Sequence, residues 1–215
     1  MNTYIREPIN GLTHLVGAIL AFIGLLAMVI KAASLQESIL HLTAIIIFGI
    51  RMILLYSASA TYHMIIAKDR IIAYFRRIDH SMIFVLIAGS YAPFCLISLD
   101  GVTGWVIFSI ITILAVLGIV FKLVWFTSPR WISTGLYIAM GWIIIFAAKP
   151  LADVLSTTGL FLLVLGGVFY TVGGIIYGFK PKWLSFKHMG FHEIFHIFIM
   201  LGSLAHFLCV YLYVI

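Results

Sequence analysis

The chain alternates long apolar runs with short polar segments. An α-helix needs about 20 apolar residues to cross a hydrocarbon core of about 30 Å, and the runs have this length. The sequence therefore predicts an all-α fold, a bundle of seven transmembrane helices that forms one domain over residues 1–215. The spans are expected near residues 12–31, 39–66, 79–99, 104–127, 131–148, 157–179 and 190–214.

Composition supports a membrane protein rather than a soluble domain. Of the 215 residues, 64% are hydrophobic and 9% are charged, and the mean hydropathy is +1.20. Soluble domains carry about 25% charged residues, and a membrane β-barrel would show short alternating segments. Cys95 and Cys209 lie in apolar runs, so neither a disulfide framework nor a Cys-x-x-Cys metal motif is expected. A cleaved signal peptide is the alternative for the first run, but its length and the preceding Glu7 favour a retained helix.

Basic residues predict the orientation of the bundle. The loops on one side contain few of them, Lys31 and Lys149, together with three acidic residues. The positive-inside rule then predicts a multi-pass protein of the cell membrane with a cytosolic N-terminus and an external C-terminus. The net charge of +6 is thus a topology signal, and the expected partners are membrane lipids rather than nucleic acid. The basic residues on the opposite, cytosolic side are Arg6, Lys68, Arg70, Arg76, Arg77, Lys122, Arg130, Lys180, Lys182 and Lys187.

Four ionisable side chains are expected at one depth of the bundle. His63 lies near the cytosolic end of the second span, Asp79 begins the third, and His192 and His196 lie near the start of the seventh. Each such group costs roughly 2.5–3.5 kcal/mol inside a bilayer on insertion scales, which favours a shared use. His192 and His196 are four residues apart and therefore share a helix face, from which both can bind one ion.

This group predicts a metal site. Three imidazoles with an open fourth position are typical of catalytic zinc, although imidazole also suits copper, nickel and iron. We therefore expect His63, His192 and His196 to hold zinc, and Asp79 to ligate the ion or to hydrogen-bond to water on it. Ser59 lies one turn from His63 and would polarise that water or a substrate carbonyl. The alternative is a set of separate interior histidines, each bonded to backbone or hydroxyl groups.

Three further residues are secondary candidates. Glu193 completes the H-E-x-x-H pattern of zinc proteases, in which the Glu is a general base, but its position favours a first-turn acid stabilised by the helix dipole. His14, with Asn10, is expected to close the site from the cytosolic side. His206 lies about 15 Å beyond His196 along the helix, so a packing role is favoured over a substrate or proton role.

Other polar and small residues predict contacts in the interior of the bundle and the position of one loop. Arg51 in the second span is expected to pair with an interior carbonyl or a lipid headgroup, and His188 is expected in a loop. Small residues let membrane helices approach closely, so the glycines of the sixth span predict a packing seam. They are Gly166, Gly167, Gly173, Gly174 and Gly178.

These residues resemble the progestin and adipoQ receptor family, in its bacterial hemolysin III branch. The resemblance covers nearly the whole chain and implies an intramembrane zinc held by His63, His192 and His196, with Asp79 and Ser59 beside it. It also implies a seven-helix fold with a cytosolic N-terminus. The matching pieces are Asn10-Gly-Leu-Thr-His14, Ser59-Ala-Thr-Tyr-His63, Asp79-His80, Ala88-Gly-Ser-Tyr-Ala-Pro93, Ala139-Met-Gly-Trp142 and His192-Glu-Ile-Phe-His196.

The same resemblance shapes the functional expectation. The wider superfamily includes adiponectin receptors and alkaline ceramidases, which look like lipid amide hydrolases. We therefore expect a zinc-dependent hydrolase of a small lipid amide or ester that acts in membrane lipid homeostasis. Alternatives are a non-catalytic sensor or receptor with a structural zinc, a pore-forming cytolysin as the hemolysin name implies, and a transporter of protons or metal. The spans show few of the polar stripes that a water-filled pore requires.

Overall fold

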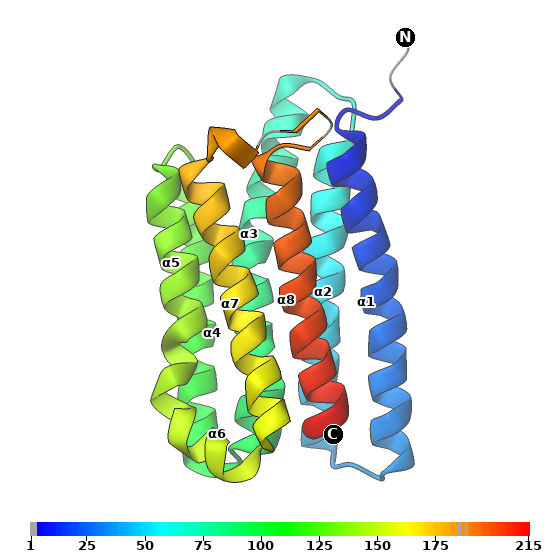
Figure 1. Ribbon diagram of the computed structural model, residues 1–215, viewed down its shortest axis with the longest axis vertical. Coiled ribbons are helices and arrows are strands. Elements are labelled where there is room, and N and C mark those ends of the chain that lie inside the picture. Colours follow the sequence, from blue (N-terminus) through cyan, green and yellow to red (C-terminus); the bar gives the residue numbers. More distant parts are fainter. Residues whose placement is uncertain (1–3, 185, 188) are drawn as a thin grey trace.

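The computed structural model describes residues 4–184, 186–187 and 189–215, so the predicted loop position of His188 lies outside the described residues. Within them the protein is a helical bundle without strands, and seven helices are long and apolar enough to cross a membrane (Figure 1). The predicted all-α, seven-helix fold is thereby confirmed. Five spans are continuous α-helices: α1 (Pro8–Ser34), α2 (Ile39–Met64), α4 (Gly101–Val124), α7 (Thr157–Phe179) and α8 (Phe191–Tyr213).

The third span is interrupted near its end. Helix α3 (Asp69–Pro93) continues as a π-helical segment (Phe94–Ser98). Pro93 has no backbone N–H to donate, and wider helical turns are a common way to absorb such a defect. The next helix packs tightly here, because a Cβ on Gly104 of α4 would lie 1.8 Å from the carbonyl oxygen of Cys95. Position 104 therefore accepts only glycine.

The fifth span is also interrupted. Helix α5 (Arg130–Trp142) passes through a 3-10 segment (Ile143–Ala147) into the short helix α6 (Ala148–Val154). The helical region thus extends beyond the predicted end at residue 148. Pro150 lies in the first turn of α6, where its missing N–H breaks no helical hydrogen bond. A further short 3-10 turn (Lys182–Leu184) lies between α7 and α8.

Helix α3 begins ten residues before the predicted start of its span at residue 79. The additional turns carry Arg70, Arg76 and Arg77. Their charges lower the local hydropathy, but arginine is a good helix former. The boundary was set by hydropathy, whereas the helix continues into the polar region at the end of the bundle.

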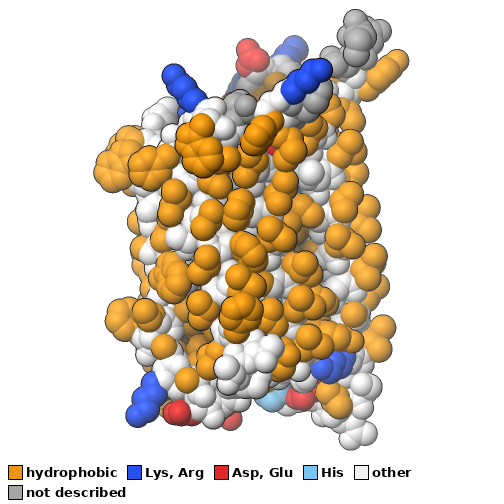
Figure 2. Space-filling model, in the orientation of Figure 1, with side chains coloured by type: hydrophobic (Ala, Val, Ile, Leu, Met, Phe, Trp, Pro, Cys, Tyr) orange, Lys and Arg blue, Asp and Glu red, His pale blue; other side chains and the backbone are white. Residues whose placement is uncertain are grey.

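The N-terminus and the C-terminus lie at opposite ends of the bundle (Figure 1). The N-terminus and the connections after α2, α4 and α7 lie at the same end of the bundle, which is called the N-terminal end. Helix α8 packs against α7 and α1, while α2 packs against α1 and α3. Hydrophobic side chains cover the middle of the face in Figure 2, and charged side chains lie at its two ends. Exposed residues such as Ile19 and Val164 fit a surface that faces lipid.

The glycines of α7 allow close packing on two sides, as the seam prediction required. A Cβ on Gly166 would lie 2.2 Å from Cδ2 of His206, and one on Gly173 would lie 3.0 Å from Cβ of Phe198, both on α8. Farther along α7, two glycines face α5. A Cβ on Gly174 would lie nearest to Ile138 and Thr134, and a Cβ on Gly178 would lie nearest to Thr134.

Arg51 is buried in the middle of α2, with 1% of its surface exposed. Its Nη1 donates a hydrogen bond to the carbonyl oxygen of Leu86 at 2.9 Å, and the guanidinium lies 4.1 Å from the centre of the Phe48 ring. Of the two predicted partners, the structure therefore shows the interior carbonyl.

Candidate metal centre

Three histidines meet at the N-terminal end of the bundle. His63 lies in the last turn of α2, and His192 and His196 lie in the first two turns of α8. One ligand nitrogen from each ring lies within 4.8 Å of the other two. The Nε2 atoms of His63 and His192 are 3.4 Å apart, and two nitrogens bound to a tetrahedral zinc are about 3.3 Å apart. The trio therefore has the spacing of a metal site.

Burial and unpartnered nitrogens also fit a metal. His63 and His196 are buried, with 1% and 2% of their surfaces exposed. The ring of His14 stacks on that of His196, with centroids 3.6 Å apart and planes at 10°. Among the described residues, neither ring nitrogen of His14 nor Nδ1 of His196 has a hydrogen-bond partner. Buried polar atoms usually have partners, so the protein alone leaves this cluster incomplete. A metal ion with its water is the kind of group that would complete it.

Glu7, which is not part of the trio, forms a hydrogen bond with His63. Its Oε2 accepts a hydrogen bond from Nδ1 of His63 at 2.6 Å, and its Oε1 lies 3.4 Å from Arg6. Burial raises the pKa of Glu7, but its hydrogen bond and charge interaction with His63, together with Arg6, outweigh this and leave the pKa below its ordinary value. The ionised carboxylate can only accept, so His63 carries its proton on Nδ1 and directs the Nε2 lone pair toward the other histidines.

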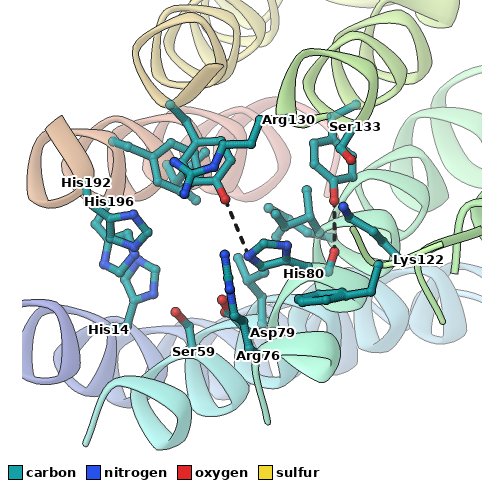
Figure 3. Close-up of a pocket in the computed structure, with 18 of the residues that line it drawn as sticks. His14, Ser59, Arg76, Asp79, His80, Lys122, Arg130, Ser133, His192 and His196 are labelled. Carbon is teal, nitrogen blue, oxygen red and sulfur yellow. Dashed lines mark hydrogen bonds between the residues drawn. The ribbon is translucent and has the colours of Figure 1, made fainter. Parts of the chain in front are cut away.

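Asp79 and Ser59 lie in a cavity of about 370 Å³ that His14, His192 and His196 line at one end. Figure 3 shows both side chains in the cavity beside this histidine end. Asp79 does not join the group of closely spaced ligand atoms within the described residues. Of its two predicted roles, the geometry favours a hydrogen bond to water over direct ligation. Its catalytic role and that of Ser59 stay predictions.

The remaining candidates have structural contacts. Glu193 accepts hydrogen bonds from the backbone N of Gly190 and from Nδ2 of Asn10, both at 2.8 Å. It therefore caps α8 and connects it to α1, as expected of a first-turn acid. Nε2 of His206 lies 3.1 Å from the carbonyl oxygen of Leu163, and the ring lines two smaller cavities of about 140 and 90 Å³.

A family model described as haemolysin-III related matches residues 2–207 of the chain. The chain belongs to this family. It is 40% identical to "Hemolysin-3" of Bacillus cereus, with an alignment over 100% of this chain and 95% of the relative. It is also 40% identical to "Hemolysin-3 homolog" of Bacillus subtilis (strain 168), over 99% of this chain and 96% of the relative. The resemblance to the hemolysin III branch is thereby confirmed.

The sequence interpretation missed two charged residues beside the candidate centre of this hemolysin III-type membrane protein. From the sequence, Glu7 serves only as an argument against a signal peptide. In the structure, Glu7 precedes α1 at the end of the bundle that carries His63. From the sequence, Lys122 serves only as an orientation signal, yet it lines the cavity beside the trio with 3% of its surface exposed. Hydropathy alone placed both near the membrane boundary. A search for charged residues at the depth of His63 would have found them.

Proposed function

We propose that the protein is a zinc-dependent hydrolase that cleaves a lipid amide or ester and contributes to membrane lipid homeostasis. The observation that carries this proposal is the cavity beside the trio, with Asp79 and Ser59 in its wall. Structural zinc sites are closed by four protein ligands, whereas catalytic sites keep an open position. We further propose the cell membrane as its location, with the N-terminal end of the bundle in the cytosol.

The proposed zinc is held by His63, His192 and His196. These are three nitrogen donors, a set that catalytic zinc shares with other transition metals. When bound, the zinc acts as a Lewis acid that polarises a carbonyl and lowers the pKa of water. Glu7 orients His63 for this task through its hydrogen bond to Nδ1.

The cavity wall supplies the remaining groups for hydrolysis. Asp79 takes the proton of the attacking water and passes it to the leaving amine or alcohol. The Ser59 hydroxyl donates a hydrogen bond to the carbonyl oxygen as negative charge develops there. Apolar side chains complete the wall and exclude water from the acyl part of the substrate: Leu55, Ile83, Leu86, Phe195 and Ile199.

A comparison of two variants tests this proposal. His196→Ala is expected to lose the metal, whereas Asp79→Asn is expected to retain it, as measured by elemental analysis of the purified protein. Both are expected to lose hydrolysis, so that the same lipid class accumulates in cells of either variant. Unchanged lipid profiles in both variants, with zinc bound in the wild type, would contradict a hydrolase.

One observation favours a second candidate, a sensor in which the metal is structural. The trio connects α2 to α8, and Glu7 and Asn10 add contacts from α1 and the segment before it. A metal here would hold three helices together without any chemistry. Asp79→Asn separates the two functions, because a sensor with a structural metal would keep full function in cells that carry this variant.

A further inference from the structure

The cavity beside the trio extends away from the histidines toward α4 and α5. Figure 3 shows the histidines at one side, Lys122 and Ser133 at the other, and Asp79, Arg76 and His80 between them. The part of the cavity that lies away from the histidines, called the basic arm, is lined by Arg76 from α3, Lys122 from α4, Ser128 from the following loop, and Arg130 and Ser133 from α5.

Lys122 is the innermost cation of the basic arm. Only 3% of its surface is exposed, and its Nζ lies 3.3 Å from the Ser128 hydroxyl, which in turn lies 3.4 Å from that of Ser133. Phe126 closes one side, with its ring centre 5.6 Å from Nζ. Removing an ammonium group from water is costly unless an opposite charge compensates it.

No carboxylate contacts these cations within the described part of the chain. Lys122, Arg76 and Arg130 all lack a carboxylate within 4.0 Å there. Among the described residues, Asp79 is the only acid that lines the same cavity, so three cations face one carboxylate. A topology signal alone does not explain this burial, because Lys182 and Lys187 carry the same kind of charge at the same end and are exposed.

We propose that the basic arm binds a phosphate group, so that the substrate is a lipid with a phosphate-bearing headgroup. This inference rests on the proposed hydrolase, which places the scissile carbonyl at the histidine end of the same cavity. Three cations and two hydroxyls offer more donors than the two oxygens of a carboxylate accept, whereas a phosphate presents three strong acceptor oxygens. The same chemistry would hold free phosphate, which the experiment distinguishes.

Binding to the purified, zinc-loaded full chain in uncharged maltoside micelles tests the proposal. Isothermal titration calorimetry compares dihexanoyl phosphatidic acid with uncharged dihexanoylglycerol, and includes inorganic phosphate as a third ligand. The phosphate lipid is expected to bind the wild type at least about tenfold more tightly than the uncharged lipid. Lys122→Met is expected to remove this difference, whereas Lys122→Arg retains it. Lys182→Gln removes an exposed positive charge from the same end and is expected to change nothing.

Equal affinity for the two lipids together with no binding of inorganic phosphate overturns the proposal, as does an equal loss in Lys182→Gln and Lys122→Met. Inorganic phosphate that binds alone, and is lost in Lys122→Met, supports the basic arm with free phosphate as its ligand. If Lys122→Met does not fold, the double variant Ser128→Ala/Ser133→Ala is expected to weaken the phosphate lipid severalfold, and unchanged affinity overturns the proposal.

Hydrolysis is tested independently of this binding. The titration is repeated with Asp79→Asn, in which no turnover is expected, so binding is measured without reaction. A chain that binds the phosphate lipid but never cleaves it would contradict the proposed function and leave the phosphate site standing. A chain that cleaves uncharged lipids, with no preference for phosphate, would support the hydrolase and overturn a phosphate-bearing lipid as its substrate.

Discussion

The carboxylate of Glu7 accepts a hydrogen bond from Nδ1 of His63 at 2.6 Å, across 56 positions of the sequence. The backbone of the same residue donates to the carbonyl oxygen of His63 at 3.0 Å. The segment before α1 is therefore fastened to the end of α2 at the place where the trio forms. A carboxylate behind a metal-binding histidine fixes its tautomer and increases its basicity as a ligand.

Glu7→Gln is expected to weaken metal binding by about 10- to 100-fold, because the neutral amide no longer favours protonation of Nδ1. Competition with a chromophoric chelator measures the metal affinity of the purified protein. Glu37→Gln is the matched control, since Glu37 makes the same kind of contact with His41, far from the trio. Equal affinity in the wild type and Glu7→Gln would show that this contact does not support the metal.

Removal of the metal is expected to lower the midpoint of thermal unfolding by several degrees, because a ligand that binds only the folded state stabilises it. The trio joins α2 to α8, so this stabilisation is lost when a chelator is added. Differential scanning fluorimetry in detergent measures the midpoint. The chelator is expected to have no effect on His196→Ala, and an equal shift in that variant would mean that the chelator acts elsewhere.

Gly166→Val is expected to destabilise the bundle by about 1–3 kcal/mol through overpacking. A Cβ at this position would lie 2.2 Å from the ring of His206. The control is Gly135→Ala in α5, where a Cβ would meet nothing within 4 Å. Urea or SDS unfolding of the two variants in detergent provides the comparison. Equal stability would mean that α7 and α8 can move apart without cost.

Purified protein in liposomes is expected to release no trapped dye. The two cavities that His206 lines are bordered mainly by apolar and aromatic side chains such as Leu163 and Trp142. A water-filled pore requires a polar lining along its whole length. Dye release that depends on protein concentration would favour the pore-forming alternative, and Gly135→Ala is a suitable folded control.

The local pattern was enough to predict the seven helices and the trio. Apolar runs about as long as the hydrocarbon core is thick leave little choice except a spanning helix, because backbone groups must be satisfied within the segment. The alternation of basic and acidic loops then placed His63, His192 and His196 at one end. Pro93 and the interrupted fifth span were harder to anticipate, since hydropathy does not distinguish an α-helix from a π- or 3-10 turn.

Chain pattern alone establishes which segments are helices and which polar residues share a membrane level, because both follow from the length and order of the spans. It does not establish rotation about each helix axis or the neighbours of each face, which depend on packing between distant segments. Packing brings Glu7 to His63, keeps Asp79 outside the ligand group and turns Lys122 inward toward Ser128. Each of these contacts joins side chains whose positions depend on how whole helices, and the segments between them, pack together.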